Sequence, residues 1–130
     1  MVRVLIVEDQ KIMQKYFEYI IMQEPEFRHV QTVSDAREAV KICDYSAIDL
    51  VIMDVKMPQM DGLTASKIIT DEHLAPVLLL TAYSQQEIVS QAKSSGVLGY
   101  LVKPVREEQL FPAMEIAISR FEEIKALGAE

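Results

Sequence analysis

Four short apolar runs in this 130-residue chain each end at a polar residue. The runs are residues 4–7, 50–53, 77–80 and 101–102, and they lead into Glu8 and Asp9, Asp54, Thr81 and Lys103 respectively. Short apolar runs that alternate with helical patterns are typical of buried strands in a parallel sheet. Ligands of such sheets bind outside the carboxyl ends of the strands. The sequence therefore predicts one crevice holding three carboxylates, one hydroxyl and one ammonium, a set suited to a divalent cation and a phosphoryl group.

Strand and helix patterns alternate five times along the chain. We expect strands at residues 2–7, 28–33, 49–54, from 75 or 76 to 81, and 98–102. We expect helices at residues 11–22, 36–44, 63–72, from 84 to 96, and from about 107 to about 126. Short connections between parallel strands imply right-handed crossovers with helices on both faces of the sheet. The pattern predicts an α/β fold, a three-layer αβα sandwich, but it does not fix the strand order.

Residues suited to helix ends stand where these helices begin or stop. Ser34 or Asp35 can cap the second helix, and Asp61 can cap the third. Ser84 can cap the fourth helix, which Gly96 would terminate as the residue just past its end. These signals support the same alternation as the apolar pattern.

Composition excludes several classes of protein. A chain of 130 residues, half of them hydrophobic, is most simply one folded domain covering residues 1–130. Its net charge of −7 disfavours direct binding of nucleic acid. Cys43 is the only cysteine, so no internal disulfide forms, and its apolar setting favours a buried thiol. No signal peptide is apparent, and no apolar run reaches the ~20 residues of a membrane span, so we expect a cytoplasmic protein that binds no membrane.

The polar residues at the strand ends suggest phosphoryl chemistry. Asp54 could bind a metal, act as a base or attack phosphorus as a nucleophile. If Glu8 and Asp9 lie on a neighbouring strand, the three carboxylates repel one another, and Mg²⁺ would relieve that repulsion. Lys103 could neutralise a phosphoryl anion, and the Thr81 hydroxyl could donate to a phosphate oxygen.

Each of these residues alone has a plain structural reading as a cap, a turn residue or a loop residue. Their occurrence together, at the same end of four different strands, is what favours a site. A Mg²⁺-dependent phosphatase or phosphotransferase acting on a small molecule is an alternative, but the loops are short for recognising a substrate. A haloacid-dehalogenase-like phosphatase would need a second aspartate where Lys56 stands. No phosphate-binding glycine-rich loop occurs, so nucleotide binding is not expected.

The chain resembles the receiver domains of response regulators over its whole length. The resemblance is carried by Glu8-Asp9, residues 49–54, residues 57–62, Thr81-Ala82, and Gly96 with residues 100–104. It implies a flavodoxin-like, doubly wound five-stranded parallel sheet in the order 2-1-3-4-5. It also implies that Asp54 accepts a phosphoryl group from a sensor histidine kinase or a phosphotransfer protein. The module would then be a signalling switch in a two-component phosphorelay, not an enzyme that turns over a substrate.

The resemblance also implies a metal site. Asp9 and Asp54 would ligate Mg²⁺ directly, Glu8 would bind it through water, and the backbone carbonyl of Lys56 would complete the protein ligands. A pseudo-receiver that no longer takes phosphate is disfavoured, because the acidic, hydroxyl and lysine residues are all present.

The same resemblance assigns the phosphoryl contacts and the switch. Thr81, Ala82 and Lys103 would contact phosphoryl oxygens, and the Lys103–Pro104 peptide would be cis. Tyr100 would turn inward when Thr81 moves toward the phosphate, a population shift between two states. We expect Lys103 to serve the phosphoryl group more than the fold.

The second half resembles more narrowly the receivers of ANTAR-type transcription antiterminators. Residues 75–85 and 100–127 carry this likeness. It implies an output in transcription antitermination, through a helical RNA-binding domain after a long last helix. The sequence stops at Glu130, before any such domain, so it is either a lone receiver that docks on a partner protein or part of a longer protein. We expect the second.

The last helix carries apolar residues in steps of four and three: Leu110, Met114, Ala117, Phe121 and Ile124. The stripe up to Ala117 is expected to face the core. Phe121 and Ile124 are expected beyond the edge of the sheet, where burial needs a partner. The rhythm resembles a coiled-coil seam and favours either a homodimer through this helix or a helix that continues further.

Overall fold

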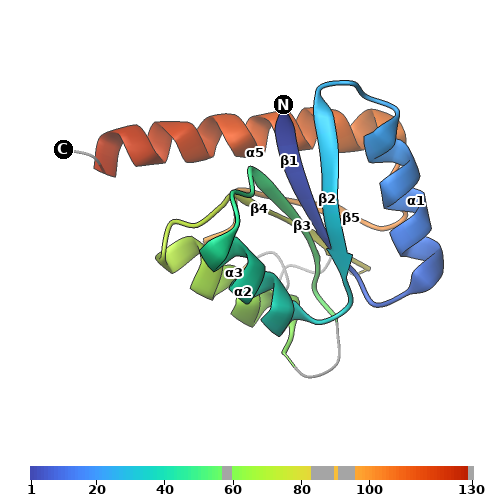
Figure 1. The fold of residues 1–130 in the computed structure, drawn as a ribbon, viewed down its shortest axis with the longest axis horizontal. Coiled ribbons are helices and arrows are strands. Elements are labelled where there is room, and N and C mark those ends of the chain that lie inside the picture. Colours follow the sequence, from blue (N-terminus) through green and yellow to red (C-terminus); the bar gives the residue numbers. More distant parts are fainter. Residues whose placement is uncertain (57–59, 83–89, 91–95, 129–130) are drawn as a thin grey trace.

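The computed structural model describes residues 1–56, 60–82, 90 and 96–128. The strands are β1 (Val2–Val7), β2 (Phe27–Val33), β3 (Leu50–Asp54), β4 (Val77–Thr81) and β5 (Gly99–Val102). The helices are α1 (Lys11–Met22), α2 (Ala36–Tyr45), α3 (Gly62–Asp71) and α5 (Glu107–Gly128), as Figure 1 shows. None of the helices in these described ranges combines the length and apolarity needed to cross a membrane.

The five strands form one parallel sheet in the order β2-β1-β3-β4-β5. This order confirms the doubly wound arrangement that the resemblance implied. It makes β3 the central strand, with β1 on one side and β4 on the other. Residues 50–53 and 77–80 are buried throughout, as continuous apolar runs in a sheet covered on both faces should be.

Helices cover both faces of the sheet, which confirms the three-layer architecture (Figure 1). On one face α1 and α5 pack on Ile6, Ile52 and Leu78, among other alternate strand residues. On the other face α2 and α3 pack on the intervening residues, including Val51 and Met53. The alternation of side chains along each strand divides the core into these two halves.

The helix caps form as the sequence predicts. The Asp35 carboxylate accepts the backbone N–H of Arg37 at 2.8 Å, and the Asp61 carboxylate accepts that of Thr64 at 2.8 Å. Gly96 has a φ of +82°, the left-handed conformation that favours glycine, but the end of the helix that it was expected to terminate lies outside the described residues. The expected cap at Ser84 lies outside the described residues.

Element boundaries differ from those expected by one or two residues. The fourth strand begins at Val77, because Pro76 has no N–H to donate and contributes only its carbonyl, which accepts the N–H of Val51 at 2.9 Å. The third helix begins at Gly62 rather than at residue 63, and α5 continues to Gly128, past the expected end near residue 126.

The expectation for Phe121 is wrong. Phe121 was expected beyond the sheet, dependent on a partner for burial, but it is only 9% exposed within the domain itself. Phe121 lines a small cavity together with His73 and Pro76, from the connection between α3 and β4, and with Leu98 just before β5. Ile124 lines the same pocket but stays about half exposed.

Candidate functional site

Three carboxylates meet at the carboxyl edge of the central strands. Glu8 and Asp9 directly follow β1, and Asp54 is the last residue of the neighbouring strand β3. Each offers an oxygen, and these oxygens all lie within 4.8 Å of one another. Glu8 is fully buried and Asp54 is 5% exposed, so neither charge is well hydrated. The structure thus brings together the acidic residues that the sequence placed at one strand edge.

Lys103 reaches into this carboxylate cluster from the end of β5. Its Nζ lies 2.9 Å from Asp54 Oδ1 and 3.2 Å from Glu8 Oε1. The peptide between Lys103 and Pro104 is cis, as the resemblance implied. One ammonium therefore interacts with two carboxylates, which leaves the cluster with excess negative charge.

The proton affinities of these groups reflect burial and crowding. Burial raises the pKa of Glu8, and the nearby charge of Asp54 raises it further. Burial also raises the pKa of Asp54, against the opposing effect of its hydrogen bond to Lys103. For Lys103, burial works against the charge, but the hydrogen bond to Asp54 and the charges of Asp54 and Glu8 outweigh it and raise the pKa. Keeping these buried carboxylates ionised therefore costs free energy, and a bound cation would reduce that cost.

Gln10 and Gln14 hold Glu8 in place. The Gln14 side-chain amide donates to the backbone carbonyl of Glu8 at 2.5 Å, and the Gln10 backbone N–H donates to Glu8 Oε2 at 3.1 Å. Both lie at the start of α1, so this helix fixes the turn that carries the acidic pair. Nothing in the sequence pattern distinguishes these glutamines from ordinary surface residues.

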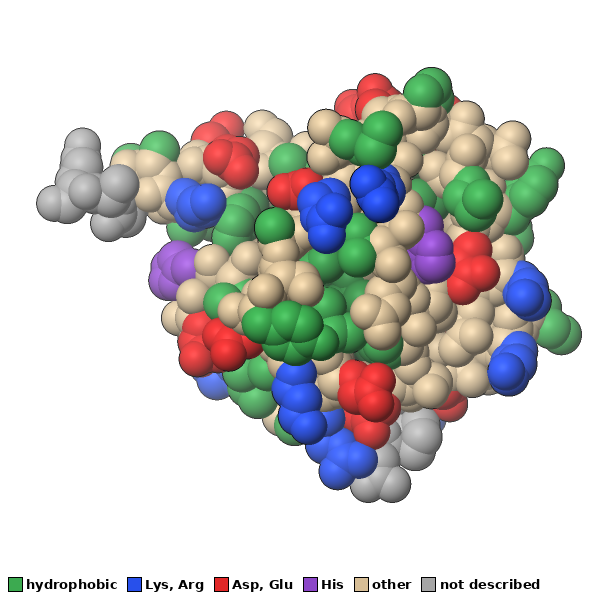
Figure 2. Space-filling model, in the orientation of Figure 1, with side chains coloured by type: hydrophobic (Ala, Val, Ile, Leu, Met, Phe, Trp, Pro, Cys, Tyr) green, Lys and Arg blue, Asp and Glu red, His purple; other side chains and the backbone are tan. Residues whose placement is uncertain are grey.

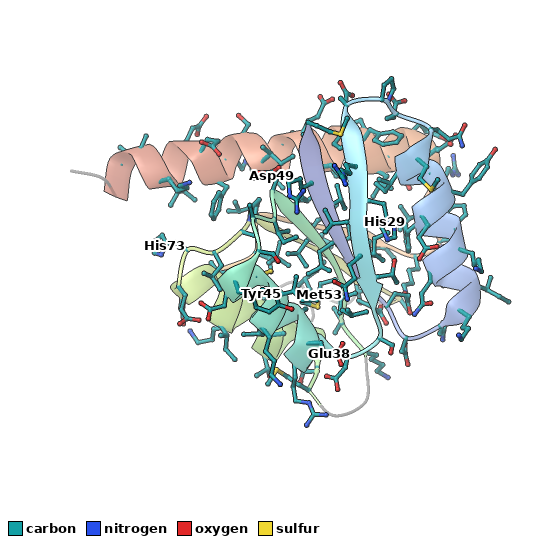
Figure 3. The ribbon with its side chains drawn as sticks, in the orientation of Figure 1. His29, Glu38, Tyr45, Asp49, Met53 and His73 are labelled. Carbon is teal, nitrogen blue, oxygen red and sulfur yellow. The ribbon has the colours of Figure 1, made fainter. Side chains whose placement is uncertain are left out.

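Gly62 supports Asp54 from the other side. A Cβ added at Gly62 would lie 2.1 Å from the backbone oxygen of Asp54, so only glycine lets α3 start this close to the site. The Gly62 N–H also donates to the carbonyl of Val55 at 2.8 Å. Met53, the residue before Asp54, packs in the core between the sheet and helices α2 and α3 (Figure 3). The pair Asp61-Gly62 was visible in the sequence, but only the structure explains the glycine.

The remaining predicted site residues lie at the ends of β4 and β5 or next to the acidic cluster. Thr81 ends β4 and is buried, and its carbonyl accepts the N–H of Lys103 at 2.7 Å. Ala82 follows it and is exposed, and Lys56 is exposed just after β3. Tyr100 lies in β5 with 41% of its surface exposed, so its side chain is at the surface. The functional roles assigned to these residues stay predictions.

The two histidines and the cysteine lie away from the site. His29 is on β2, where its Nε2 is 2.6 Å from the Thr32 hydroxyl, and His73 follows α3 on another part of the surface (Figure 3). Cys43 is buried in α2, and burial raises the pKa of its thiol to about 12. A thiol of that kind is inert, as expected.

The side chains present fit a hard divalent cation. Carboxylate oxygens are the ligands that Mg²⁺ takes, usually one or two together with water and phosphate oxygens. The excess negative charge of the cluster and the raised pKa of two of its members are what a bound cation would reverse. Lys103 adds the positive group that suits a phosphoryl oxygen.

Comparison with known proteins identifies similar sequences and folds. A family model described as the response regulator receiver domain matches residues 4–115. The transcriptional regulatory protein PdtaR of Mycobacterium tuberculosis is 42% identical over 128 residues, which are 98% of this chain and 62% of PdtaR. The transcriptional regulatory protein YdfI of Bacillus subtilis is 31% identical over 116 residues, 89% of this chain and 54% of YdfI. The chain thus spans less than two thirds of the length of either relative.

Solved structures agree in fold. The chemotaxis protein CheY4 of Vibrio cholerae superposes with a TM-score of 0.80 at 28% sequence identity, covering 90% of this chain and 98% of CheY4. A signal receiver domain from the Mycobacterium tuberculosis response regulator NarL superposes with a TM-score of 0.82 at 21% identity, covering 93% of this chain and 96% of the other. The chain therefore has the fold of solved receiver domains.

Proposed function

Because this chain belongs to the response-regulator receiver family, we propose that Asp54 accepts a phosphoryl group from a sensor histidine kinase or a phosphotransfer protein. The observation that carries the proposal is the position of Lys103, whose Nζ lies 2.9 Å from Asp54 Oδ1 inside a cluster of three carboxylates. A carboxylate so placed has a cation beside the oxygen that would bond to phosphorus.

Each residue around Asp54 would have a separate role in the phosphoryl transfer. One Asp54 oxygen attacks phosphorus while the bond from phosphorus to the donor's histidine nitrogen breaks, and the imidazole leaves with the electron pair. Lys103 shifts its ion pair from the carboxylate to the new phosphoryl oxygens. Thr81 and Ala82, at the end of β4, contact the other phosphoryl oxygens. Glu8 stays beside Lys103 and keeps the ammonium in place, as its 3.2 Å contact supports.

Mg²⁺ fits the acidic cluster as the cofactor. Asp9 and Asp54 would hold it directly, Glu8 through water, and the carbonyl of Lys56 would complete the protein ligands. When bound, the ion neutralises the crowded carboxylates and the charge of the incoming phosphoryl group. The contacts of Gln10 and Gln14 to Glu8 favour a turn already shaped for this role.

Phosphorylation would act as a switch. Thr81 moves toward the phosphoryl group, and Tyr100, now exposed on β5, turns into the space that Thr81 leaves. The new charge biases an equilibrium between two states and alters the surface formed by β5 and α5 together with the helix expected between them.

The proposed output is control of transcription in the cytoplasm. PdtaR and YdfI are transcriptional regulatory proteins, and the likeness of the second half to ANTAR-type receivers makes antitermination the more specific proposal. The domain would signal through protein contacts, including a homodimer through α5, and its charge of −7 disfavours direct contact with nucleic acid.

The test of the proposed function is phosphorylation by a small donor. Acetyl phosphate with Mg²⁺ should add one phosphoryl group, read as an increase in intact mass. Asp54→Asn should take none, whereas Asp49→Asn, at the opposite end of β3, should react like the parent protein. Full phosphorylation of Asp54→Asn would exclude Asp54 as the acceptor.

A further inference from the structure

An apolar groove opens directly beside the carboxylate cluster. Its volume is about 550 Å³, and it is lined by Ile12, Met13, Tyr16, Lys103, Pro104 and Val105. The first three belong to α1, and the others follow β5. Lys103 belongs to both features, because its Nζ lies 2.9 Å from Asp54 Oδ1. The groove and the phosphoacceptor therefore form one continuous surface.

The walls of this groove are held in place by contacts within the domain. The Tyr16 hydroxyl donates to the carbonyl of Val105 at 2.6 Å, which ties α1 to the segment after β5. The Tyr16 ring meets the buried ring of Phe17 edge-on at 5.4 Å. Ile12, on the rim, is 83% exposed. Figure 2 shows hydrophobic side chains on the outer surface of α1, at the right of the view.

The size and lining of the groove suit a small apolar group attached to an anion. Small-molecule sites are typically ~300–1,000 Å³, mostly apolar, with few polar groups that fix orientation. Here Lys103 is the polar group, and its ammonium faces the site while its methylenes can line the groove. A ligand that places phosphate at Lys103 can lay an apolar chain against Ile12 and Met13.

We propose that this groove binds the leaving group of the phosphodonor, so that the domain reacts faster with acyl phosphates that carry an apolar chain than with acetyl phosphate. The inference rests on the proposed role of Asp54. An Asp54 carboxylate oxygen bonds to phosphorus while the bond from phosphorus to the acyl oxygen breaks. The acyl carboxylate leaves with the electron pair, so the step transfers no proton and needs no oxidant.

Straight-chain acyl phosphates provide a matched test, because acetate, butyrate and hexanoate leave with nearly equal ease. The rate of mass increase is measured at low concentrations of each donor with the same Mg²⁺. It is normalised to the rate at which that donor hydrolyses near neutral pH without protein, a reaction that breaks the same bond from phosphorus to the acyl oxygen. Each methylene fully removed from water favours binding about fourfold, and an open groove covers about half of a chain. Butyryl phosphate should therefore react roughly fourfold faster than acetyl phosphate.

Two serine variants show whether the preference for butyryl phosphate arises in this groove. Ile12→Ser should bring the ratio of butyryl to acetyl rates close to one. Because Ile12 is exposed, this substitution should leave the fold unchanged. Ile116→Ser, the same change at an exposed position on α5, should keep the preference. Butylphosphonate, which cannot transfer its phosphorus, should shift the NMR signal of the Met13 methyl group more than methylphosphonate does.

Different outcomes separate the two proposals. Equal normalised rates for all donors, or a preference that survives in Ile12→Ser, would overturn the groove assignment while leaving Asp54 as the acceptor. A Met13 signal that responds equally to both phosphonates would overturn it as well. Failure of every donor to phosphorylate Asp54 would overturn the proposed function and the groove inference together.

Discussion

Lys103 lies between two carboxylates in a cluster that contains three. Sequence reasoning assigned its ammonium to the phosphoryl group more than to the fold. The contacts at 2.9 Å and 3.2 Å indicate that it also stabilises the folded state before any phosphate arrives. Removing one partner from a buried ion pair costs more than the pair itself contributes, because the remaining charge stays buried.

Lys103→Met should lower the free energy of unfolding in EDTA by roughly 2 kcal/mol, less than the ~3–5 kcal/mol of a fully buried pair because Lys103 is partly exposed. Mg²⁺ should recover part of the loss, since the ion supplies the missing positive charge. Urea unfolding with and without Mg²⁺ measures both effects. Lys67→Met, which breaks an exposed pair with Asp71, is the control and should cost under about 0.5 kcal/mol.

The raised pKa values of Glu8 and Asp54 predict how stability depends on pH without metal. Above the ordinary values of 4.5 and 3.8, the folded protein binds more protons than the unfolded chain, so stability falls as pH rises through this window. The raised pKa of Lys103 matters only in the alkaline range, and the lowered pKa of Asp35 matters only near or below pH 3.8.

The free energy of unfolding in EDTA should therefore be lower at about pH 8 than at about pH 5. Glu8→Gln should flatten this dependence, because it removes one of the two groups responsible. Chemical denaturation across the range measures the slope. A rise in stability over the same interval would mean that hydrogen bonds to the charged carboxylates outweigh their burial.

At the scale of elements, the start of α3 is fixed by the backbone of β3. Replacing glycine by alanine inside a helix usually stabilises it by about 0.5–1 kcal/mol. At Gly62 the sign should reverse, because the new Cβ would lie 2.1 Å from the carbonyl oxygen of Asp54. Overpacking of this kind typically costs about 1–3 kcal/mol.

Gly62→Ala should therefore lower the melting temperature and slow phosphorylation by acetyl phosphate, because relief of the clash displaces Asp54 or α3. Gly99→Ala is the matched control, since its Cβ would meet only a side-chain methyl of Leu78 at 3.2 Å. Thermal unfolding and the rate of mass increase are measured on both variants. Equal behaviour of the two would show that α3 shifts without consequence for the site.

The second half of α5 depends on one aromatic side chain. Phe121 lines a small cavity with the α3–β4 connection and Leu98, and it is the last buried residue of the helix within the described range. Phe121→Ala should cost about 3 kcal/mol, at the low end for large-to-small changes because the site borders solvent. Ile124→Ala should cost clearly less. Hydrogen exchange should show the end of α5 opening more readily in the first variant.

At the scale of the whole molecule, the sequence predicts the strands of the sheet better than it predicts the side-chain contacts around them. The strands and the acidic edge follow from buried apolar runs and from the rule that parallel strands end at one edge. The order 2-1-3-4-5 came only from the resemblance, because alternation alone is compatible with other windings. The contact of Gln14 with Glu8 and the burial of Phe121 depend on tertiary packing, which local periodicity does not record.

With Phe121 inside the domain, the surface available for pairing on α5 is different from the seam read in the sequence. The large apolar residues exposed there, within the described range, are Ile116, Ile124 and Leu127. Ile116 and Leu127 are about three helical turns apart and share a face, and Ile124 lies one turn before Leu127. Figure 1 shows the C-terminal end of α5 extending past the edge of the sheet.

We therefore expect this face, not Phe121, to mediate self-association, strengthened when Asp54 carries a phosphoryl mimic. Sedimentation with beryllofluoride and Mg²⁺ should show a shift from monomer toward dimer. Ile124→Ser combined with Leu127→Ser should abolish the shift, because each removes apolar area that only a partner can bury. Ile12→Ser, which removes an exposed apolar side chain from α1, should leave it intact. A strict monomer in every state would mean that α5 relays the signal to a different protein, and that a dimer is no part of the output.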